Sequence, residues 1–319
     1  MGKTGYFTHR DFWKHDMGNG HPECPERLDA IEDRLLLTGV GDALARGEVP
    51  LATLEQITRA HSHAHVEHLE ELQQRLVADA PAGGPDHAQV DPDTVLTRFT
   101  LLAARRAAGA AVAATDAVMA GEVENAFCPV RPPGHHACRE QAMGFCFFNN
   151  VAIAARHALE VHGLDRVAII DFDVHHGNGT EDIFENDEHV VMASIFQHPF
   201  YPYSGAQDPA PNMFNVPLAA GAGSRELRQA VQEVWIPALD EFKPQLVVFS
   251  AGFDAHAEDD MAMLRFTDAD YGWVTQAVAE VAQRHAGGRM VSMLEGGYAL
   301  SALGRSAVQH IRVLAGLNA

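Results

Sequence analysis

Hydrophobic and polar positions in the second half of the chain follow a pattern typical of strands that alternate with helices. Short apolar runs predict strands at 126–130, 167–170, 190–196, 246–250 and 290–294. Longer segments with apolar residues at helical spacing predict helices at 97–120, 148–161, 225–242, 268–285 and 302–317. Such alternation predicts an α/β fold, a parallel sheet with helices on both faces. Without an internal repeat, we expect a single domain over 1–319.

The first hundred residues follow this pattern less clearly. A short strand is expected around Tyr6, and a helix from about Arg27, because prolines and glycines interrupt the segment between them. The helical segment 54–79 carries a group of closely spaced histidines, namely His61, His63, His65 and His68. We interpret these as solvated or capping residues rather than metal ligands. The segment 81–93 is rich in Gly, Pro and Asp and predicts a loop at the rim of a site.

Composition excludes several classes of function. The formal charge is −20 without any basic block, so we expect no nucleic-acid partner, whereas an acidic surface would favour cationic substrates. No apolar run reaches the roughly 18 residues of a membrane span, and the start of the chain has no signal-like segment. We therefore expect a cytoplasmic protein without a membrane partner. The 4 cysteines form no CxxC pair, which favours free thiols. A homo-oligomer is possible on the sequence alone.

Polar residues follow several of the predicted strands. In chain order these are His135 and His136, then Asp171, Asp173 and His175, then Asp254, and finally Tyr298. In parallel α/β folds the ligand site lies beyond the carboxyl ends of the strands, so we expect these side chains to meet.

Their chemistry fits a metal-assisted reaction. Asp173 and His175 share a face while the chain stays extended, and with Asp254 they make three ligands that leave a position open, as a catalytic zinc requires. One histidine of the His135–His136 pair can take a proton from water and give it to a leaving amine. Tyr298 can donate a hydrogen bond to the developing oxyanion.

Asp171 and Asn178 are suited to orient the two imidazoles from behind. The complete set predicts amide hydrolysis. Taken singly, each residue has another interpretation: the histidine pair as structural, Asp254 as a helix cap and Tyr298 as a packed aromatic. Their joint position after strands favours the metal site.

At these residues the chain resembles the zinc-dependent histone deacetylase family, which has the arginase–deacetylase fold. The resemblance runs from about residue 20 to the C-terminus and rests on the motifs RPPGHHA, GFCFFNNVAIAA, IIDFDVHHGNGTEDIF, SAGFDAH and EGGY. The segment HPECPERL and the asparagine at Asn178 resemble the class II branch and its bacterial deacetylase-like amidohydrolases.

The resemblance implies roles for individual residues. It implies Zn²⁺ on Asp173, His175 and Asp254, with His136 as general base and acid. His135, backed by Asp171, would be an electrostatic partner, and Tyr298 would polarise the carbonyl. Arg27 would lie behind the active site. A narrow acyl-lysine channel would be lined by Gly144, Phe145, Tyr201, Met261, Gly296 and Gly297.

The resemblance also implies structural monovalent cations, K⁺ or Na⁺. One would be held by Asp171, Asp173, His175 and Ser194 with the main chain of Ile195. A second would be held by main-chain oxygens near Phe184, Asp187, Val190 and Asn212.

The chain departs from the family pattern at several positions. Cys138 follows the GHHA motif where the family often has an acid, and Tyr201 brings a phenol to a channel position usually held by phenylalanine. Met261 replaces the leucine of the channel rim. An acidic residue at that position would indicate polyamine substrates, and Met261 is not acidic. The neighbouring Glu258, Asp259 and Asp260 nevertheless leave a cationic substrate possible.

The leading hypothesis is a zinc amidohydrolase that removes acetyl or short acyl groups from a lysine side chain in a peptide or protein. An acetylpolyamine amidohydrolase, acting on an acylated small amine, is the first alternative. An arginase-type ureohydrolase would need more aspartates around a second metal than SAGFDAH provides. A non-catalytic acyl-ligand-binding or scaffold protein would be favoured by loss of Tyr298 or of either motif histidine, and all of these are present.

Overall fold

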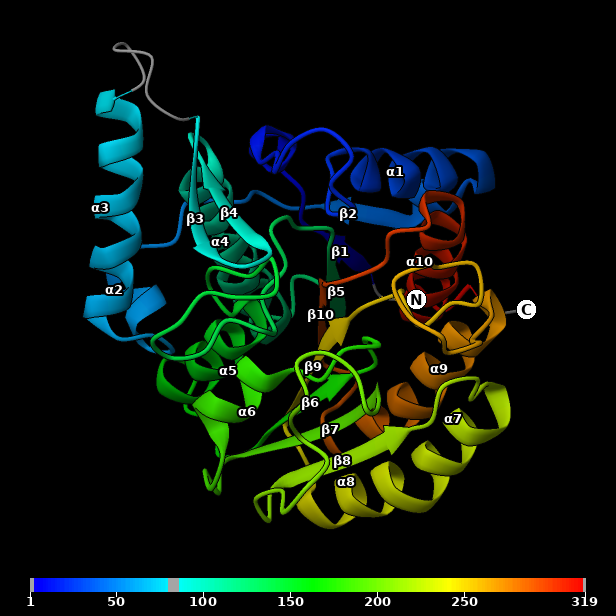
Figure 1. Ribbon diagram of the computed structural model, residues 1–319. Coiled ribbons are helices and arrows are strands. Elements are labelled where there is room, and N and C mark those ends of the chain that lie inside the picture. The colour runs from blue at the N-terminus through cyan, green and yellow to red at the C-terminus, as the bar shows by residue number, and fades with distance from the viewer. Residues whose placement is uncertain (1–2, 80–85, 318–319) are drawn as a thin grey trace.

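The computed structural model describes residues 3–79 and 86–317. Its central feature is an 8-stranded sheet with the order β2-β1-β5-β10-β9-β6-β7-β8 (Figure 1). All neighbouring strands in it run parallel. The strands are β1 (Thr4–Tyr6), β2 (Leu44–Arg46), β5 (Asn125–Cys128), β6 (Val167–Asp171), β7 (Val190–Gln197), β8 (Met213–Leu218), β9 (Leu246–Ala251) and β10 (Met290–Leu294).

Helices cover both faces of this sheet, which confirms the predicted α/β fold (Figure 1). On one face α4 (Thr100–Met119) and α5 (Asn150–Glu160) pack against the central strands. On the other, α1 (Glu26–Thr38), α9 (Asp268–His285) and α10 (Leu300–Leu314) pack against one another. The shorter helices are α2 (Leu54–Thr58), α3 (His63–Asp79), α6 (Asn178–Phe184), α7 (Ser224–Ala230) and α8 (Ile236–Phe242).

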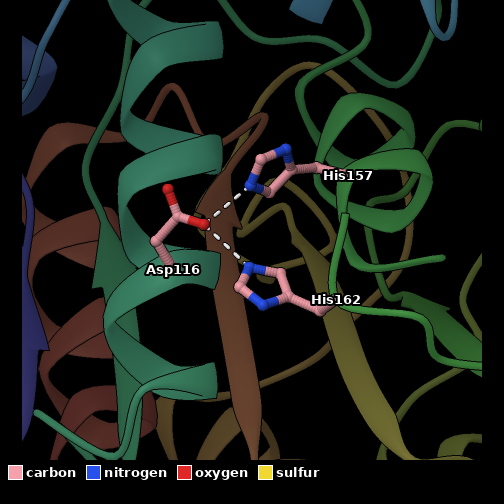
Figure 2. A group of neighbouring side chains, drawn as sticks. All are labelled: Asp116, His157 and His162. Carbon is pink, nitrogen blue, oxygen red and sulfur yellow. Dashed lines mark hydrogen bonds and ion pairs between the residues drawn. The ribbon is translucent and has the colours of Figure 1, made fainter. Parts of the chain in front are cut away.

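Helix α4 can lie close to its neighbours because most of its buried side chains are alanines. At Gly109 the approach is closer still, since a Cβ atom there would lie 1.9 Å from the carbonyl oxygen of Pro50. The close packing of α4 on α5 also brings together Asp116, His157 and His162 near the ends of the two helices (Figure 2).

The structure differs from the predicted elements at the periphery. Strand β3 (His87–Asp91) lies inside the segment 81–93 that was expected to be a loop, and it pairs antiparallel with β4 (Thr94–Thr97). Residues 80–85 of that segment are outside the described residues. The edge strands β2 and β8 were also missed, because partly exposed strands lack a continuous apolar run.

The predicted helix 225–242 is present but is not uniform. A π-helical turn at Val231–Trp235 joins α7 to α8. Within residues 3–79 and 86–317, no helix combines the length and the apolar character that a membrane span requires.

Candidate active site

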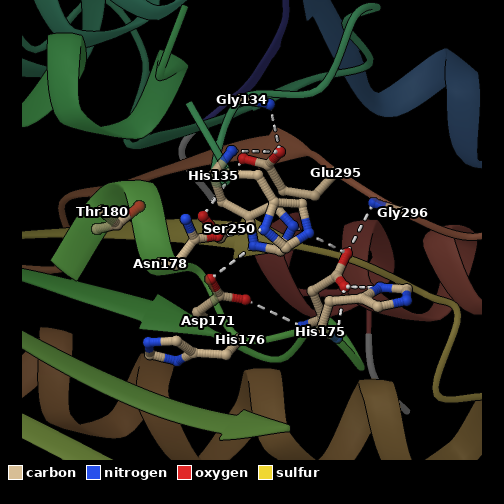
Figure 3. A network of polar contacts seen from close by, with 12 residues as sticks. Gly134, His135, Asp171, His175, His176, Asn178, Thr180, Ser250, Glu295 and Gly296 are labelled. Carbon is tan, nitrogen blue, oxygen red and sulfur yellow. Dashed lines mark hydrogen bonds and ion pairs between the residues drawn. The ribbon is translucent and has the colours of Figure 1, made fainter. Parts of the chain in front are cut away.

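The strands that precede the polar motifs are neighbours in the sheet. Strands β5, β10, β9 and β6 lie side by side in that order, although they are far apart in the sequence. Since these strands are parallel, the segments that follow them meet at one edge of the sheet (Figure 3). The structure thereby brings the predicted residues of all four motifs together.

Asp173, His175 and Asp254 form a buried cluster that could hold a metal ion. One ligand atom from each lies within 4.8 Å of the other two. His175 Nδ1 lies 3.0 Å from Asp173 Oδ1 and 3.2 Å from Asp254 Oδ2. Burial and the charge of Asp173 raise the pKa of Asp254 to about 6, and its Oδ2 has no well-aligned hydrogen-bond donor. Two buried carboxylates around one imidazole fit a divalent cation, which would compensate their charge.

Two glycines make room for these carboxylates. A Cβ atom on Gly252 would lie 2.0 Å from Asp173 Oδ2. A Cβ atom on Gly296 would lie 2.1 Å from Asp254 Oδ2 and 2.6 Å from Asp173 Oδ2. Gly296 also donates its backbone N–H to Asp173 Oδ2 at 2.9 Å. Both positions therefore require glycine if the cluster is to keep its geometry.

The route by which Asp173 and His175 converge differs from the prediction. Strand β6 ends at Asp171, so the chain is not extended across the three residues. Instead, Asp171 Oδ1 accepts the backbone N–H of Asp173 at 3.1 Å, and Asp173 Oδ1 accepts that of His175 at 2.9 Å. Two successive side-chain turns, rather than the period of a strand, aim these residues at one point.

His136 is held as a neutral base by Asn178. Its Nδ1 lies 2.8 Å from Asn178 Oδ1, and the amide nitrogen of Asn178 points to the sulfur atoms of Cys138 and Met143, both at 3.4 Å. The amide oxygen therefore faces the ring and accepts the Nδ1 proton, which leaves Nε2 with a free lone pair. Burial and the charges of His135 and His175 hold the pKa of His136 well below its usual value.

His135 has the opposite electrostatic environment. Its Nδ1 lies 3.0 Å from Asp171 Oδ2, and its ring centroid is 4.1 Å from that of His136. Burial disfavours a charge on this ring, but Asp173 and Asp171 outweigh burial and raise the pKa of His135 to about 10. The two adjacent imidazoles are thus differentiated by a carboxylate behind one and an amide behind the other.

Glu295 supports the histidine loop and was not singled out from the sequence. Its Oε2 accepts the backbone N–H groups of Gly134 at 2.6 Å and His135 at 3.1 Å (Figure 3). Burial raises the pKa of this carboxyl group to about 7. The signal was present, since Glu295 is an acid directly after the fully buried strand β10.

A buried ion network lies behind the site and includes Arg27, as predicted from the resemblance. Arg27 donates to the main-chain oxygens of Gly297 at 2.7 Å and Glu295 at 2.5 Å, and its guanidinium lies 4.9 Å from the Tyr298 ring centroid. Glu23 accepts from Arg27 at 3.0 Å and from Arg131 at 2.6 Å. Although burial disfavours its charge, these arginines lower the pKa of Glu23 to about 2.

A cavity of about 190 Å³ opens onto the cluster. Its lining residues are Asp93, His136, Gly144, Phe145, His175, Phe200, Tyr201, Met261 and Tyr298. Of the channel residues expected from the resemblance, Gly144, Phe145, Tyr201 and Met261 are among them, whereas Gly296 and Gly297 are not. Gly144, at φ +56°, allows close approach, since a Cβ atom there would lie 2.4 Å from the His136 ring. The cavity is smaller than the usual 300–1,000 Å³ of a ligand pocket and suits a narrow, unbranched chain.

Tyr298 is positioned through its backbone. Asp259 Oδ2 accepts the N–H of Tyr298 at 2.6 Å and that of Ala299 at 2.9 Å. Asp259 thus fixes the backbone of Tyr298, and the expectation that the acidic segment favours a cationic substrate stays a prediction. Glu258 is also engaged, because it accepts from Arg305 at 2.7 Å. The acid that does line the cavity is Asp93, whose pKa is raised to about 6 by burial and by Asp91.

The two regions expected to hold monovalent cations differ in whether their ligand atoms already have hydrogen-bond partners. In the first, Ser194 lies opposite Asp171 on the neighbouring strand, and its buried Oγ has no hydrogen-bond partner, which fits a cation ligand. In the second, the carbonyl oxygens of Phe184, Asp187 and Val190 all accept from Asn212 Nδ2, at 2.7, 3.2 and 2.9 Å. The three carbonyl oxygens that the resemblance assigns to an ion converge on the Asn212 amide nitrogen, and the second cation stays a prediction.

The histidines of 54–79 include two that are not solvated. His61 and His65 are buried, which corrects that expectation. His61 Nδ1 lies 2.9 Å from the Cys138 carbonyl oxygen, and His65 Nε2 lies 2.9 Å from that of Phe147. They anchor the loop between β5 and α5, and among the described residues neither belongs to a metal-like cluster.

Comparison with known proteins agrees with this architecture. Residues 21–314 match the model of the histone deacetylase domain. A histone deacetylase-like amidohydrolase of Pseudomonas aeruginosa is 41% identical, over 88% of this chain and 73% of its own. A probable deacetylase of Archaeoglobus fulgidus is 35% identical, over 93% of this chain and 82% of its own. The crystal structure of the HDA15 HD domain has a TM-score of 0.91 at 34% identity and covers 99% of this chain and 90% of that one.

The chain therefore belongs to the histone deacetylase family. Its sheet and its flanking helices are those of the arginase–deacetylase fold. Membership of this family of deacetylases and amidohydrolases indicates hydrolase activity, and the Asp/His cluster fits a metal cofactor.

Proposed function

We propose that the protein removes acetyl or other short acyl groups from the Nε atom of lysine side chains with the help of Zn²⁺. The observation that carries the proposal is the position of His136. His136, whose Nε2 is left free by the hydrogen bond of Nδ1 to Asn178, lines the same narrow cavity as Tyr298 and the cluster residue His175. Two carboxylates and one imidazole with an open position are a ligand set suited to catalytic zinc.

When bound, the ion would act as a Lewis acid toward the amide carbonyl and the attacking water. His136 would take the proton of that water at Nε2 and deliver it to the leaving amine. His135, held by Asp171, would stabilise negative charge, and the Tyr298 hydroxyl would donate a hydrogen bond to the developing oxyanion.

The cavity walls favour a lysine-like substrate. Phe145 and Tyr298 meet edge to face with ring centroids 6.1 Å apart, and Tyr201 packs on the other side against His136 at 5.3 Å. These aromatic walls can enclose an aliphatic chain of four methylene groups without supplying a charge partner along it.

An acetylpolyamine is the second candidate, and Asp93 is the observation that favours it. Its carboxyl group lines the cavity, where it could bind the distal ammonium of a small amine. The same carboxylate could instead accept main-chain N–H groups of a peptide. Both substrates are compatible with the proposed chemistry.

The test combines zinc analysis with a substrate panel of acetyl-lysine peptide, trifluoroacetyl-lysine peptide, acetylputrescine and acetylspermidine. We expect one zinc at this cluster and the highest kcat/KM on an acyl-lysine. Tyr298→Phe should keep the zinc and reduce turnover by roughly 10²-fold or more. A fully reconstituted protein that hydrolyses no member of the panel would contradict the proposal, and a preference for acetylputrescine would select the second candidate.

A further inference from the structure

Asp116, His157 and His162 form a second Asp/His cluster, remote from the strand-end site (Figure 2). Asp116 lies in the last turn of α4, His157 in the last turn of α5, and His162 just after that helix. Both helices lead into the amino ends of strands, β5 and β6. The cluster therefore lies at the edge of the sheet opposite to the candidate active site.

The geometry of the cluster is convergent. The Nε2 atoms of His157 and His162 both lie 2.7 Å from the same oxygen, Asp116 Oδ1. The two rings meet nearly at right angles, with an interplanar angle of 77° and centroids 5.3 Å apart. The three ligand atoms lie within 4.8 Å of one another, so one small cation could contact all of them once the hydrogen bonds to Asp116 are given up.

We propose that this cluster is a binding site for a divalent transition-metal ion such as Zn²⁺. Two imidazole nitrogens and a carboxylate oxygen are preferred ligands of zinc at four-coordinate sites. The Asp116 side chain is 51% exposed and that of His162 is 23% exposed, so a water molecule can complete the coordination. The C-terminal ends of α4 and α5 also carry partial negative charge, which favours a cation.

The hydrogen bond from Arg59 to His157 competes with metal binding at this site. Its Nη1 lies 2.8 Å from His157 Nδ1, and since a guanidinium only donates, Nδ1 must accept and Nε2 must carry the proton. A metal ligand at Nε2 needs the lone pair there, which moves the proton to Nδ1, facing Arg59. Metal binding therefore requires Arg59 to release His157. Two carboxylates can retain the released side chain, Glu55 at 3.0 Å and Glu160 at 3.4 Å.

The experiment measures Zn²⁺ binding to the full-length protein by equilibrium dialysis with elemental analysis. We expect two equivalents in the parent protein and one in His162→Ala, because that variant loses a ligand of this site alone. His87→Ala is the matched control, since His87 is also an exposed histidine 2.8 Å from an aspartate, Asp86, but has no third ligand nearby. It should keep both equivalents.

Arg59→Gln tests the control exerted by the arginine. A glutamine carbonyl can accept the Nδ1 proton of metal-bound His157, so the second equivalent should bind about tenfold more tightly, in line with the effect of groups behind metal ligands. The proposal is wrong if His162→Ala binds as many equivalents as the parent, or if Arg59→Gln binds no more tightly than the parent. Thermal unfolding of each variant checks that it is folded. The expected total of two rests on the proposed zinc at the candidate active site, whereas the difference between the parent and His162→Ala does not depend on it.

Discussion

Asn178 Oδ1 lies 2.8 Å from His136 Nδ1 and fixes which nitrogen of that ring carries the proton. The orientation of the amide is itself determined by two sulfur atoms, which accept from its nitrogen at 3.4 Å. A neutral amide can orient the ring without favouring its charged form, whereas a carboxylate in the same place would favour imidazolium.

Replacing Asn178 with Asp should therefore raise the pKa of His136. Because a general base must be neutral to accept a proton, the acid limb of the kcat/KM profile should move to higher pH, by about one unit or more. Asn178→Ala is the control: it should lower kcat at all pH values without that displacement. An unchanged acid limb in Asn178→Asp would show that His136 is not the base.

Glu295→Ala should destabilise the protein and slow catalysis together. The variant leaves the buried N–H groups of Gly134 and His135 without an acceptor, which costs about 1–3 kcal/mol for each group. Glu295→Gln keeps an acceptor oxygen and is the matched control. The free energy of unfolding, measured with denaturant, and kcat should both fall in Glu295→Ala and stay near the parent values in Glu295→Gln. Equal effects of the two substitutions would contradict the role assigned to the Oε2 acceptor.

Gly296→Ala should abolish metal binding at the candidate active site while leaving the fold intact. The new methyl group would lie 2.1 Å from Asp254 Oδ2, so a ligand carboxylate must move. Gly272→Ala, in the interior of α9 and with no atom closer than 3.6 Å to the new methyl group, is the control and should be neutral or slightly stabilising. Zinc stoichiometry and melting temperature together distinguish local from global effects.

Acid should destabilise the protein through buried neutral histidines. His310 is fully buried between Thr275 at 2.6 Å and Ser292 at 2.8 Å, and burial lowers its pKa to about 3. The unfolded chain, with a pKa near 6.5, takes up the proton first, so stability falls as pH decreases from about 6.5 to about 3. At pH 4.5 this contribution amounts to roughly 2–3 kcal/mol.

His310→Gln removes the titrating group, so its free energy of unfolding should fall less between pH 7 and pH 4.5 than that of the parent. Part of the loss should remain, because burial also lowers the pKa of His15 to about 4 and that of His61 to about 3. Chemical denaturation at both pH values measures the difference. Equal losses in parent and variant would show that His310 is protonated in the folded state or does not titrate.

Asn212→Ala should destabilise the loop that ends at β7. The carbonyl oxygens of Phe184, Asp187 and Val190 would lose their common donor, at a cost of about 1–3 kcal/mol. If the amide replaces an ion, K⁺ should raise the melting temperature of the variant more than that of the parent. An equal K⁺ effect on both proteins would contradict this interpretation.

The sequence alone was sufficient for the features that depend on neighbouring residues. Each central strand is a continuous apolar run because it is buried on both faces, so strands such as β6 could be predicted within a residue or two. The motifs after these strands identified the metal-cluster candidates and the histidine pair, and the family resemblance is confirmed. Edge strand β8 was missed because its exposed positions break the apolar run.

Tertiary structure decided what depends on contacts between distant segments. Only the sheet order places β10 between β5 and β9, so that Glu295 can reach the backbone of His135, 160 residues away. The convergence of Asp173 and His175 came from side-chain turns and not from the strand period. Asp116 and His157 lie on two helices whose packing no local pattern encodes, because long-range pairing follows from how the whole core closes.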